Sequence, residues 1–316
     1  MKSATSCSDR RLFYPVLWKK NMARFWPVWA LYGLVWLVAL PLNLMTNYRG
    51  GGSWSGLDEG ANHFANYTVL EYAGELSVIL SVGFAILAAM AVFSYLYQSR
   101  SVGMLHALPV KREGLFLTNY LSGLSFLLLP AVAVFGLALL AEAAKGCLNA
   151  GALGLWLGCQ VCYALFFYSF AVFCAMFTGN LVALPVFYGI LNFLATILVR
   201  LVETVCSTFL YGFEQFPSQV WDARAWLTPV RNLTTAVSPE YQASPGGGFT
   251  SILTGGIQSP ETVAVYAAAG VALAAAALLV YRTRHIESAK DVVAVKLVRP
   301  VFKYGFAFCT GLTGGM

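Results

Sequence analysis

Residues 262–281 read TVAVYAAAGVALAAAALLVY, a run of 20 residues that contains no charged side chain. A helix needs about 20 mostly apolar residues to cross the hydrocarbon core of a bilayer. This run is therefore long enough and apolar enough to be a transmembrane helix. Ala and Gly dominate it, and small side chains let neighbouring helices approach closely in lipid. We expect this helix to pack tightly against its neighbours.

Five more apolar runs of similar length precede it. Of the 316 residues, 59% are hydrophobic and only 11% are charged, whereas soluble domains carry about 25% charged residues. This composition excludes a water-soluble fold and a disordered chain. The strands of a transmembrane barrel would alternate in polarity, but these runs are continuously apolar. We therefore predict an all-α polytopic membrane protein with six transmembrane helices, near residues 26–45, 76–98, 115–141, 151–177, 181–202 and 262–281.

The basic residues are distributed unevenly between these runs. Segments 1–25, 99–114 and 282–316 carry 15 of the 20 Lys and Arg residues but only 4 of the 14 Asp and Glu residues. Their net charge is +11, against −5 for the rest of the chain. Because cytoplasmic loops are rich in Lys and Arg, we expect these three segments on the cytoplasmic side. The sequence thus predicts a multi-pass plasma membrane protein with a cytoplasmic N-terminus.

Residues 1–25 are predicted to form a cytoplasmic amphipathic helix at the membrane interface. Pro15 suits the first turn of this helix, and Pro27 would separate it from the first span. Its basic residues would face anionic lipid, and its apolar side would enter the acyl boundary. That apolar side consists of Phe13, Val16 and Leu17. A disordered basic tail held by lipid charge is the alternative.

The remaining chain divides into a membrane domain and a basic tail. Residues 26–281 form the predicted six-helix domain. Residues 282–316 begin as a cytoplasmic basic segment and end in YGFAFCTGLTGGM. This ending reads as the start of a seventh span.

The loop 99–114 joins the second and third spans and reads SRSVGMLHALPVKREG. Its apolar residues fall on one side of a short helix that ends at Pro109, and two bases follow. An apolar knob rimmed by bases fits a socket on a soluble partner, whereas a membrane-surface helix without a partner is the alternative. The residues concerned are Met104, Leu105, Leu108, Lys111 and Arg112.

Residues 203–260 form the predicted extracellular loop between the last two spans. This loop is rich in aromatic residues and prolines, and its apolar pieces are too short to cross a membrane. Since Trp and Tyr concentrate at membrane interfaces, we expect the loop to fold onto the bundle and the membrane surface.

The cysteines are scattered, and only two of them have a recognisable spacing. Cys159 and Cys162 have the CxxC spacing of a metal or redox pair. They lie in an apolar run without a second pair or a nearby His, so we interpret them as buried packing residues. Cys147 and Cys206 both fall on the predicted outer side, where an oxidising environment would allow them to pair.

Two groups of charged residues lie near the predicted outer ends of spans. Glu71 and Glu75 are four residues apart and are expected on one face of the helix that opens the second span. We interpret them as offsetting the helix dipole, and paired carboxylates for proton chemistry are the alternative. Arg200 and Glu203 are spaced to form an ion pair at the end of the fifth span.

The residue patterns of common enzymes are missing from this sequence. It has no GxxxxGK[ST] loop for phosphate and no GxSxG elbow, and its three His residues all fall in predicted loops. No ionisable residue falls near the middle of a span, where ion-coupled transporters place theirs. We therefore expect no enzyme activity, metal, cofactor or nucleic-acid partner for this chain. Any ATP would be bound and hydrolysed by another chain.

Two stretches resemble the permeases of ABC-2-type exporters, especially those of Firmicutes and clostridia. Residues 105–124, LHALPVKREGLFLTNYLSGL, resemble the segment between the second and third spans of that family. Residues 289–305, AKDVVAVKLVRPVFKYG, resemble the join after the sixth span in longer members, which continue past a seventh span.

The resemblance implies an ABC-2-type (type V) exporter topology. In this topology residues 9–25 match an amphipathic N-terminal helix, and residues 203–260 match a membrane-dipping loop. The loop 99–114 matches the coupling helix that meets the ATPase. The residues that this match assigns to coupling are Met104, Leu105, His106, Leu108, Lys111 and Arg112.

The sequence as a whole predicts the permease subunit of an ATP-binding cassette exporter. The expected partners are a cytosolic ATP-binding cassette ATPase, a second permease subunit in a homodimer or heterodimer, and the lipid membrane. A path with few charges favours a hydrophobic or amphipathic cargo. The alternative function is that of a non-transporting membrane scaffold or sensor.

Overall fold

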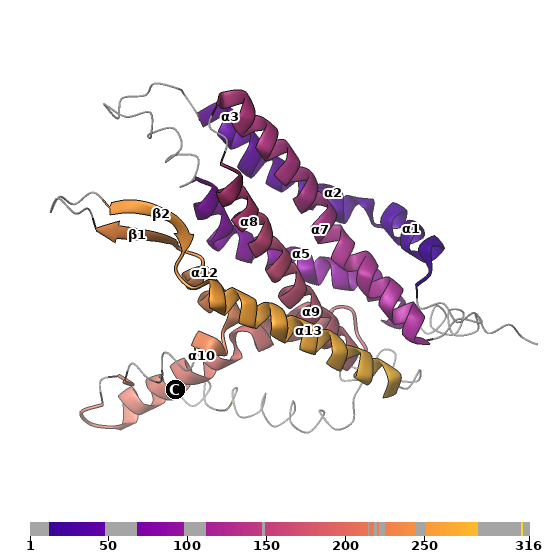
Figure 1. The fold of residues 1–316 in the computed structure, drawn as a ribbon. Helices are drawn as coiled ribbons and strands as arrows, with labels where there is room; N and C mark the ends of the chain where they lie inside the picture. Colours follow the sequence, from indigo (N-terminus) through magenta and orange to yellow (C-terminus); the bar gives the residue numbers. More distant parts are fainter. Residues whose placement is uncertain are drawn as a thin grey trace, which may run out of the picture.

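The computed structural model describes residues 13–47, 68–97, 112–146, 149–213, 215–217, 220, 225–243, 251–283 and 311. Within these residues, six helices are long and apolar enough to cross a membrane (Figure 1). The chain is therefore a helical multi-pass membrane protein, as its sequence predicts. The six spans are Trp26–Thr46, Thr68–Tyr97, Arg112–Lys145, Ala150–Phe177, Ala183–Phe209 and Pro260–Arg282.

The spans are built from helices that are interrupted in several places. The helices and strands are α1 (Pro15–Arg24), α2 (Trp26–Leu37), η1 (Val38–Leu42), α3 (Asn43–Asn47), α5 (Glu75–Phe93), η2 (Ser94–Tyr97), α7 (Arg112–Lys145), α8 (Ala150–Tyr163), η3 (Ala164–Tyr168), α9 (Ser169–Phe177), α10 (Ala183–Phe209), α12 (Pro229–Ala236), β1 (Pro239–Ala243), β2 (Ser251–Ile257) and α13 (Pro260–Thr283). We call the end of the bundle where β1 and β2 lie the hairpin end, and the end where α7 begins and α13 stops the loop end (Figure 1).

Two spans contain a π-helical segment. In the first span, η1 includes Pro41, whose nitrogen carries no hydrogen and cannot continue the α-helical hydrogen-bond ladder. The wider π turn absorbs this break, so the helix continues into α3. In the fourth span, η3 has the sequence ALFFY and joins α8 to α9 without a proline.

The second span begins at Thr68, eight residues before the predicted start. It is interrupted at Gly74, which has φ −80° and ψ −117° and stands at the N-cap of α5. Glu71 and Glu75 are both exposed and lie on either side of this interruption. The spacing of these two residues predicts one shared helical face, but the interruption at Gly74 separates them. The sequence before residue 76 is too mixed in polarity to reveal this early start.

The antiparallel hairpin of β1 and β2 departs from the all-α prediction. Tyr241 pairs with Leu253, and Gln242 pairs with Ile252. These strands flank the Gly-rich stretch SPGGG, residues 244–248. Two strands of five and seven residues leave a much weaker signal than a 20-residue apolar run, which explains why sequence analysis missed them.

The segment between α10 and α13 packs onto the hairpin end of the bundle. Helix α12 contacts α5, α10 and α13, and Leu233 and Val237 are buried. Tyr266 of α13 donates its hydroxyl hydrogen to the carbonyl of Trp226 at 2.8 Å, and Asn232 donates to the Tyr266 oxygen at 3.1 Å. Within the 203–260 loop, the part around α12 is thus docked onto the helices, as predicted, whereas residues 203–209 continue α10.

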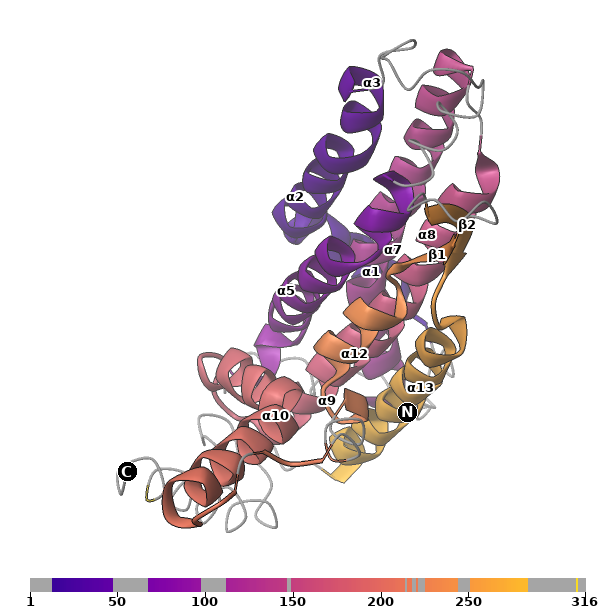
Figure 2. The same cartoon turned by 90° about the vertical axis from the view of Figure 1, so that its left-hand side faces the viewer.

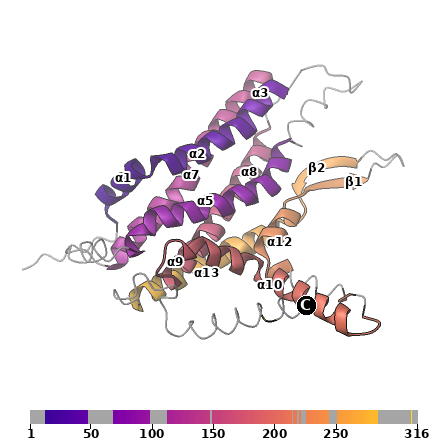
Figure 3. The ribbon, with the colours of Figure 1, turned by 180° about the vertical axis from the view of Figure 1, so that it is seen from behind.

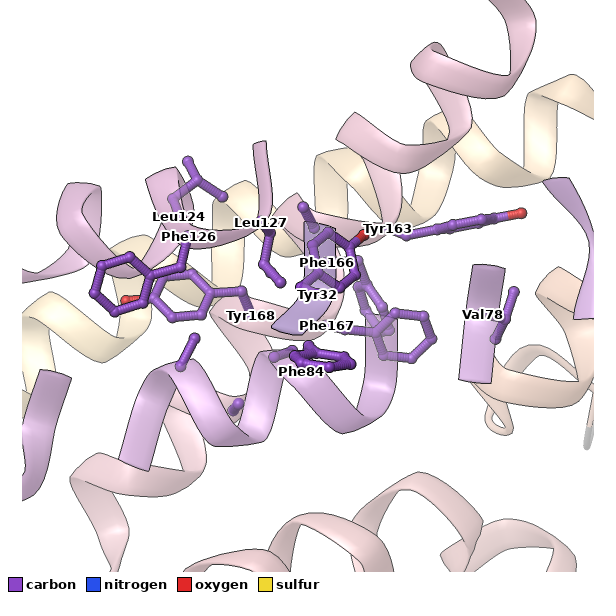
Figure 4. Close-up of a cluster of buried hydrophobic side chains, with 14 of the residues drawn as sticks. Tyr32, Val78, Phe84, Leu124, Phe126, Leu127, Tyr163, Phe166, Phe167 and Tyr168 are labelled. Carbon is purple, nitrogen blue, oxygen red and sulfur yellow. The ribbon is translucent and has the colours of Figure 1, made fainter. Parts of the chain in front are cut away.

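The core is rich in aromatic side chains. The rings of Tyr32 and Phe84 lie 5.0 Å apart, and both belong to the buried cluster in Figure 4. The indole rings of Trp36 and Trp156 also lie 5.0 Å apart, edge to face, and both are fully buried. These contacts join the first span to the second and fourth.

Helix α13 packs closely against η3 and α9, as its small residues predict. At Gly270 an added Cβ would lie 2.7 Å from the carbonyl oxygen of Leu165 and 2.7 Å from the Cα of Phe166. Backbone thus meets backbone at this crossing. No residue larger than glycine fits there without moving one of the two helices.

Helix α10 is the span with the least packing. Its buried residues are Leu184, Tyr188 and Asn192, all in its first half. From there it projects away from the other spans (Figure 2). The apolar side chains that it leaves exposed include Val186, Phe193, Ile197, Val202 and Phe209.

Candidate functional site

The predicted coupling residues lie almost entirely outside the described residues. The structure describes both ends of the segment that carries them, because η2 ends at Tyr97 and α7 begins at Arg112. Arg112 is exposed. We call η2 together with residues 112–125 of α7 the loop root, since the 99–114 loop leaves the bundle there. The coupling residues outside the described ranges are Met104, Leu105, His106, Leu108 and Lys111.

An ion pair joins the loop root to the sixth span. Glu113, in the first turn of α7, lies 2.9 Å from Arg282 in the last turn of α13, measured from Oε1 to Nη2. Both side chains are about half exposed, at 45% and 48%. Each charge also suits its own helix, because an acid near an N-terminus and a base near a C-terminus interact favourably with the helix dipole.

Aromatic contacts lie directly beside this ion pair. Tyr281 is 4% exposed, and its ring centroid lies 5.3 Å from that of Phe116 in α7. Its hydroxyl lies 3.4 Å from the hydroxyl of Tyr95 in η2. Phe93 completes the cluster, with its ring 5.7 Å from Phe116. The last turn of α13 therefore contacts both parts of the loop root.

The end of η2 is also attached to α9. The Tyr97 hydroxyl donates to the carbonyl oxygen of Ala175 at 3.3 Å and lies 3.5 Å from the hydroxyl of Thr178. Tyr97 is buried. The chain thus enters the 98–111 segment from a residue fixed against the fourth span.

Helix α1 packs along α7 through polar side chains (Figure 3). Asn21 is buried and donates to Asn119 at 2.9 Å and to Ser122 at 3.3 Å. The indole of Trp18 donates to the hydroxyl of Ser125 at 3.2 Å, and the backbone of Tyr14 donates to Thr118 at 3.1 Å. We call these four hydrogen bonds the α1 clasp.

The α1 clasp shows which face of the N-terminal helix packs against α7. The helix begins at Pro15 and is separated from α2 at Phe25, close to the predicted positions. Val16, predicted to enter the acyl boundary together with Leu17, is 80% exposed, and the face opposite the lysines bonds to α7. The insertion of Val16 and Leu17 into lipid stays a prediction. Trp18 and Asn21 therefore decide which face packs inward, a role that hydrophobic periodicity did not reveal.

The third turn of α7 and the turns beyond it are held by the fourth span. Tyr120 and Ser169 share a hydrogen bond of 2.7 Å between their hydroxyls. Gly123 lies so close to Tyr168 that an added Cβ would overlap the tyrosine oxygen. The loop root is consequently packed against α1, α9, η3 and α13 together.

Other polar residues of the bundle form local contacts away from the loop root. Gln160 donates to Ser77 at 2.6 Å and accepts from Tyr32 at 3.2 Å, which links three spans within the core. Arg200 and Glu203 form the predicted ion pair at 3.2 Å. Glu142, near the hairpin end, is 1% exposed and accepts a hydrogen bond from the backbone of Asn149.

The described cysteines are free thiols. Cys159 is buried and Cys162 half-buried in the fourth span, as the packing interpretation predicts. Cys206 is free, and Cys147 lies outside the described residues. Among the residues that the structure describes, no group of three His, Cys, Asp or Glu side chains is placed to hold a metal ion.

Sequence analysis did not identify Glu113, Tyr281 and Arg282 as site residues. Only a weak signal was available, because Glu113 is the one acid in the otherwise basic 99–114 loop. In the sequence, Arg282 stands out only as one of the basic residues of segment 282–316. Its partner could not be inferred, because the two residues are 169 positions apart in the chain.

Comparison of the chain with protein families, with curated proteins and with solved structures finds no match.

Proposed function

We propose that this chain is the membrane subunit of an ATP-binding cassette exporter of the ABC-2 type. A separate cytosolic ATPase binds the 99–114 loop, and two permease subunits enclose the export path. The loop end faces the cytoplasm in the plasma membrane, because the basic segments are concentrated there. The cargo is hydrophobic or amphipathic, in keeping with the few charges of the spans.

The observation that carries this proposal is the packing of the loop root. A surface that receives force from a partner must be attached firmly to the helices that it moves. Tyr97 is hydrogen-bonded to α9, while the start of α7 packs on α13 through Phe116 and Tyr281, beside the half-exposed Glu113–Arg282 pair. This arrangement supports a role of the loop in transmitting force.

In the proposed mechanism, ATP binding closes the two ATPase subunits and pushes on the 99–114 loop. Because the loop continues into η2 and α7, the push tilts the second and third spans. The apolar Met104, Leu105 and Leu108 seat in the ATPase, while Lys111 and Arg112 contact acidic groups at the rim of that socket. His106 lies between these apolar residues and contacts the same surface.

The test is capture of the ATPase by the tagged permease. Replacing Leu105 and Leu108 with Asp places unpaired charges in the apolar contact, where their burial costs several kcal/mol. We expect the ATPase that co-purifies with the native protein to be lost. The matched control replaces both residues with Met, which keeps the contact apolar and should retain the ATPase.

The thermal unfolding of each purified variant shows whether the permease itself remains folded. Unchanged capture of the ATPase by the folded Asp variant would refute the proposed contact. If the native protein co-purifies with no ATPase at all, the alternative of a membrane scaffold or sensor is favoured.

A further inference from the structure

The last turn of α13 contacts both parts of the loop root through two neighbouring residues. Tyr281 contacts Tyr95 of η2 through its hydroxyl and Phe116 of α7 through its ring. Arg282 adds the ion pair to Glu113. A ring contact and an ion pair at successive positions restrict both the distance and the rotation of α13 relative to α7.

The other end of α13 is attached to the docked segment at the hairpin end. The Tyr266 hydroxyl bonds to the carbonyl of Trp226 at 2.8 Å, and their side chains stack with centroids 6.1 Å apart. Asn232 of α12 donates to the same hydroxyl at 3.1 Å. One continuous helix of 24 residues therefore joins the loop root to α12.

Between these two attachments, α13 crosses η3 at Gly270. The close approach to the backbone of Leu165 and Phe166 prevents the two segments from moving closer together. Because the nearest atoms at this crossing belong to the backbone, a change of side-chain rotamer cannot relieve the contact. The separation between α13 and η3 is therefore fixed at this crossing.

We propose that α13 is a lever that turns about Gly270 and carries displacement of the loop root to α12 at the hairpin end. Tyr281 and Arg282 are the positioning residues at one end of the lever, and Tyr266 is the positioning residue at the other. This inference extends the proposed function, because it names the span that transmits the force received by the loop. The movement itself is a property of this chain and is measurable without an ATPase.

The first measurement tests the attachment at the loop end. Spin labels are placed on cysteines substituted at Leu117 of α7 and Leu279 of α13, both exposed positions, in a variant without native cysteines. Arg282→Glu puts two like charges against each other, so we expect the distance between the labels to shift and its distribution to broaden. The double variant Glu113→Arg/Arg282→Glu restores the attraction and should restore the native distribution.

The second measurement tests transmission to the hairpin end. Labels at Leu140 of α7 and Leu227 beside α12, again exposed positions, report on the remote attachment. Arg282→Glu and Tyr281→Ala should each shift this distance, and the charge-swapped double variant should bring it back. Tyr281→Phe keeps the ring contact and should shift the distance less than Tyr281→Ala.

The matched control is Arg200→Glu, which reverses one charge of an ion pair within α10. It should leave both label distances unchanged. If Arg282→Glu changes the distance between 117 and 279 but not that between 140 and 227, the lever is refuted. If neither distance changes, the positioning role of Arg282 is refuted as well. Neither outcome depends on ATPase capture, so failure of the lever and failure of the proposed function are distinguishable.

Discussion

At the scale of single residues, glycines at two helix crossings decide how closely the spans approach. Gly270 lies against the backbone of η3, and Gly123 lies against the ring of Tyr168. The first contact is the stricter one, because a backbone cannot move away as a side chain can. By contrast, a Cβ added at Gly136 of α7 would meet no described atom within 4 Å, so packing does not require glycine there.

We expect Gly270→Ala to destabilise the protein by about 1–3 kcal/mol, the usual cost of overpacking a core. Gly136→Ala is the control, because it adds the same methyl group in open space. That change should be neutral or stabilise the helix by up to about 1 kcal/mol. Unfolding in mixed micelles measures both variants, and equal stabilities would contradict the close crossing.

At the scale of elements, the N-terminal helix shows what hydrophobic pattern alone leaves out. Pro15 and Pro27 predict where α1 begins and where α2 follows, because proline has a fixed φ and no N–H. The inward face of α1 is set by Asn21 and Trp18, whose partners lie about 100 residues away in α7. Long-range hydrogen bonds of this kind have no local signature.

The bond between Asn21 and Asn119 should be measurable by a double-mutant cycle. Asn21→Ala removes the donor to the buried Asn119 oxygen, and Asn119→Ala leaves the Asn21 amide with Ser122 as its remaining acceptor. Each single variant should therefore lose about 1–3 kcal/mol of stability. The double variant should lose less than the sum of the two, because neither amide remains. Strict additivity in the unfolding free energies would show that the pair contributes no coupling.

At the scale of the whole molecule, the sequence predicts the number and order of the spans because 20-residue apolar runs are strong signals. It does not predict the interruption at Gly74 or the short strands β1 and β2, which depend on few residues. The sequence predicts a role for the 99–114 loop, but it does not predict the contacts that attach the loop root to other helices. The contacts of Tyr281 and Arg282 with the loop root join residues far apart in the chain, so only the structure shows them.

The orientation of the whole molecule remains a prediction from charge. In a variant without native cysteines, Ser53→Cys should react with a membrane-impermeant thiol reagent in intact cells, whereas Ser101→Cys should react only after the cells are opened. The reason is that the positively charged 99–114 loop is retained in the cytoplasm. Reaction of Ser101→Cys alone in intact cells would invert the topology.

The length of α7 has a consequence for its place in the bilayer. Its 34 residues extend about 51 Å at about 1.5 Å per residue, whereas the hydrocarbon core is about 30 Å thick. Even at a tilt of about 40° the helix covers about 39 Å of thickness. Its ends therefore reach the headgroup layers. The Glu113–Arg282 pair, at one of these ends, then lies among lipid headgroups, whose charge depends on the lipid composition. Hydrophobic mismatch thus becomes a means by which the bilayer sets the height of the loop root, since α7 tilts less in a thicker membrane and its charged start then lies further from the bilayer midplane.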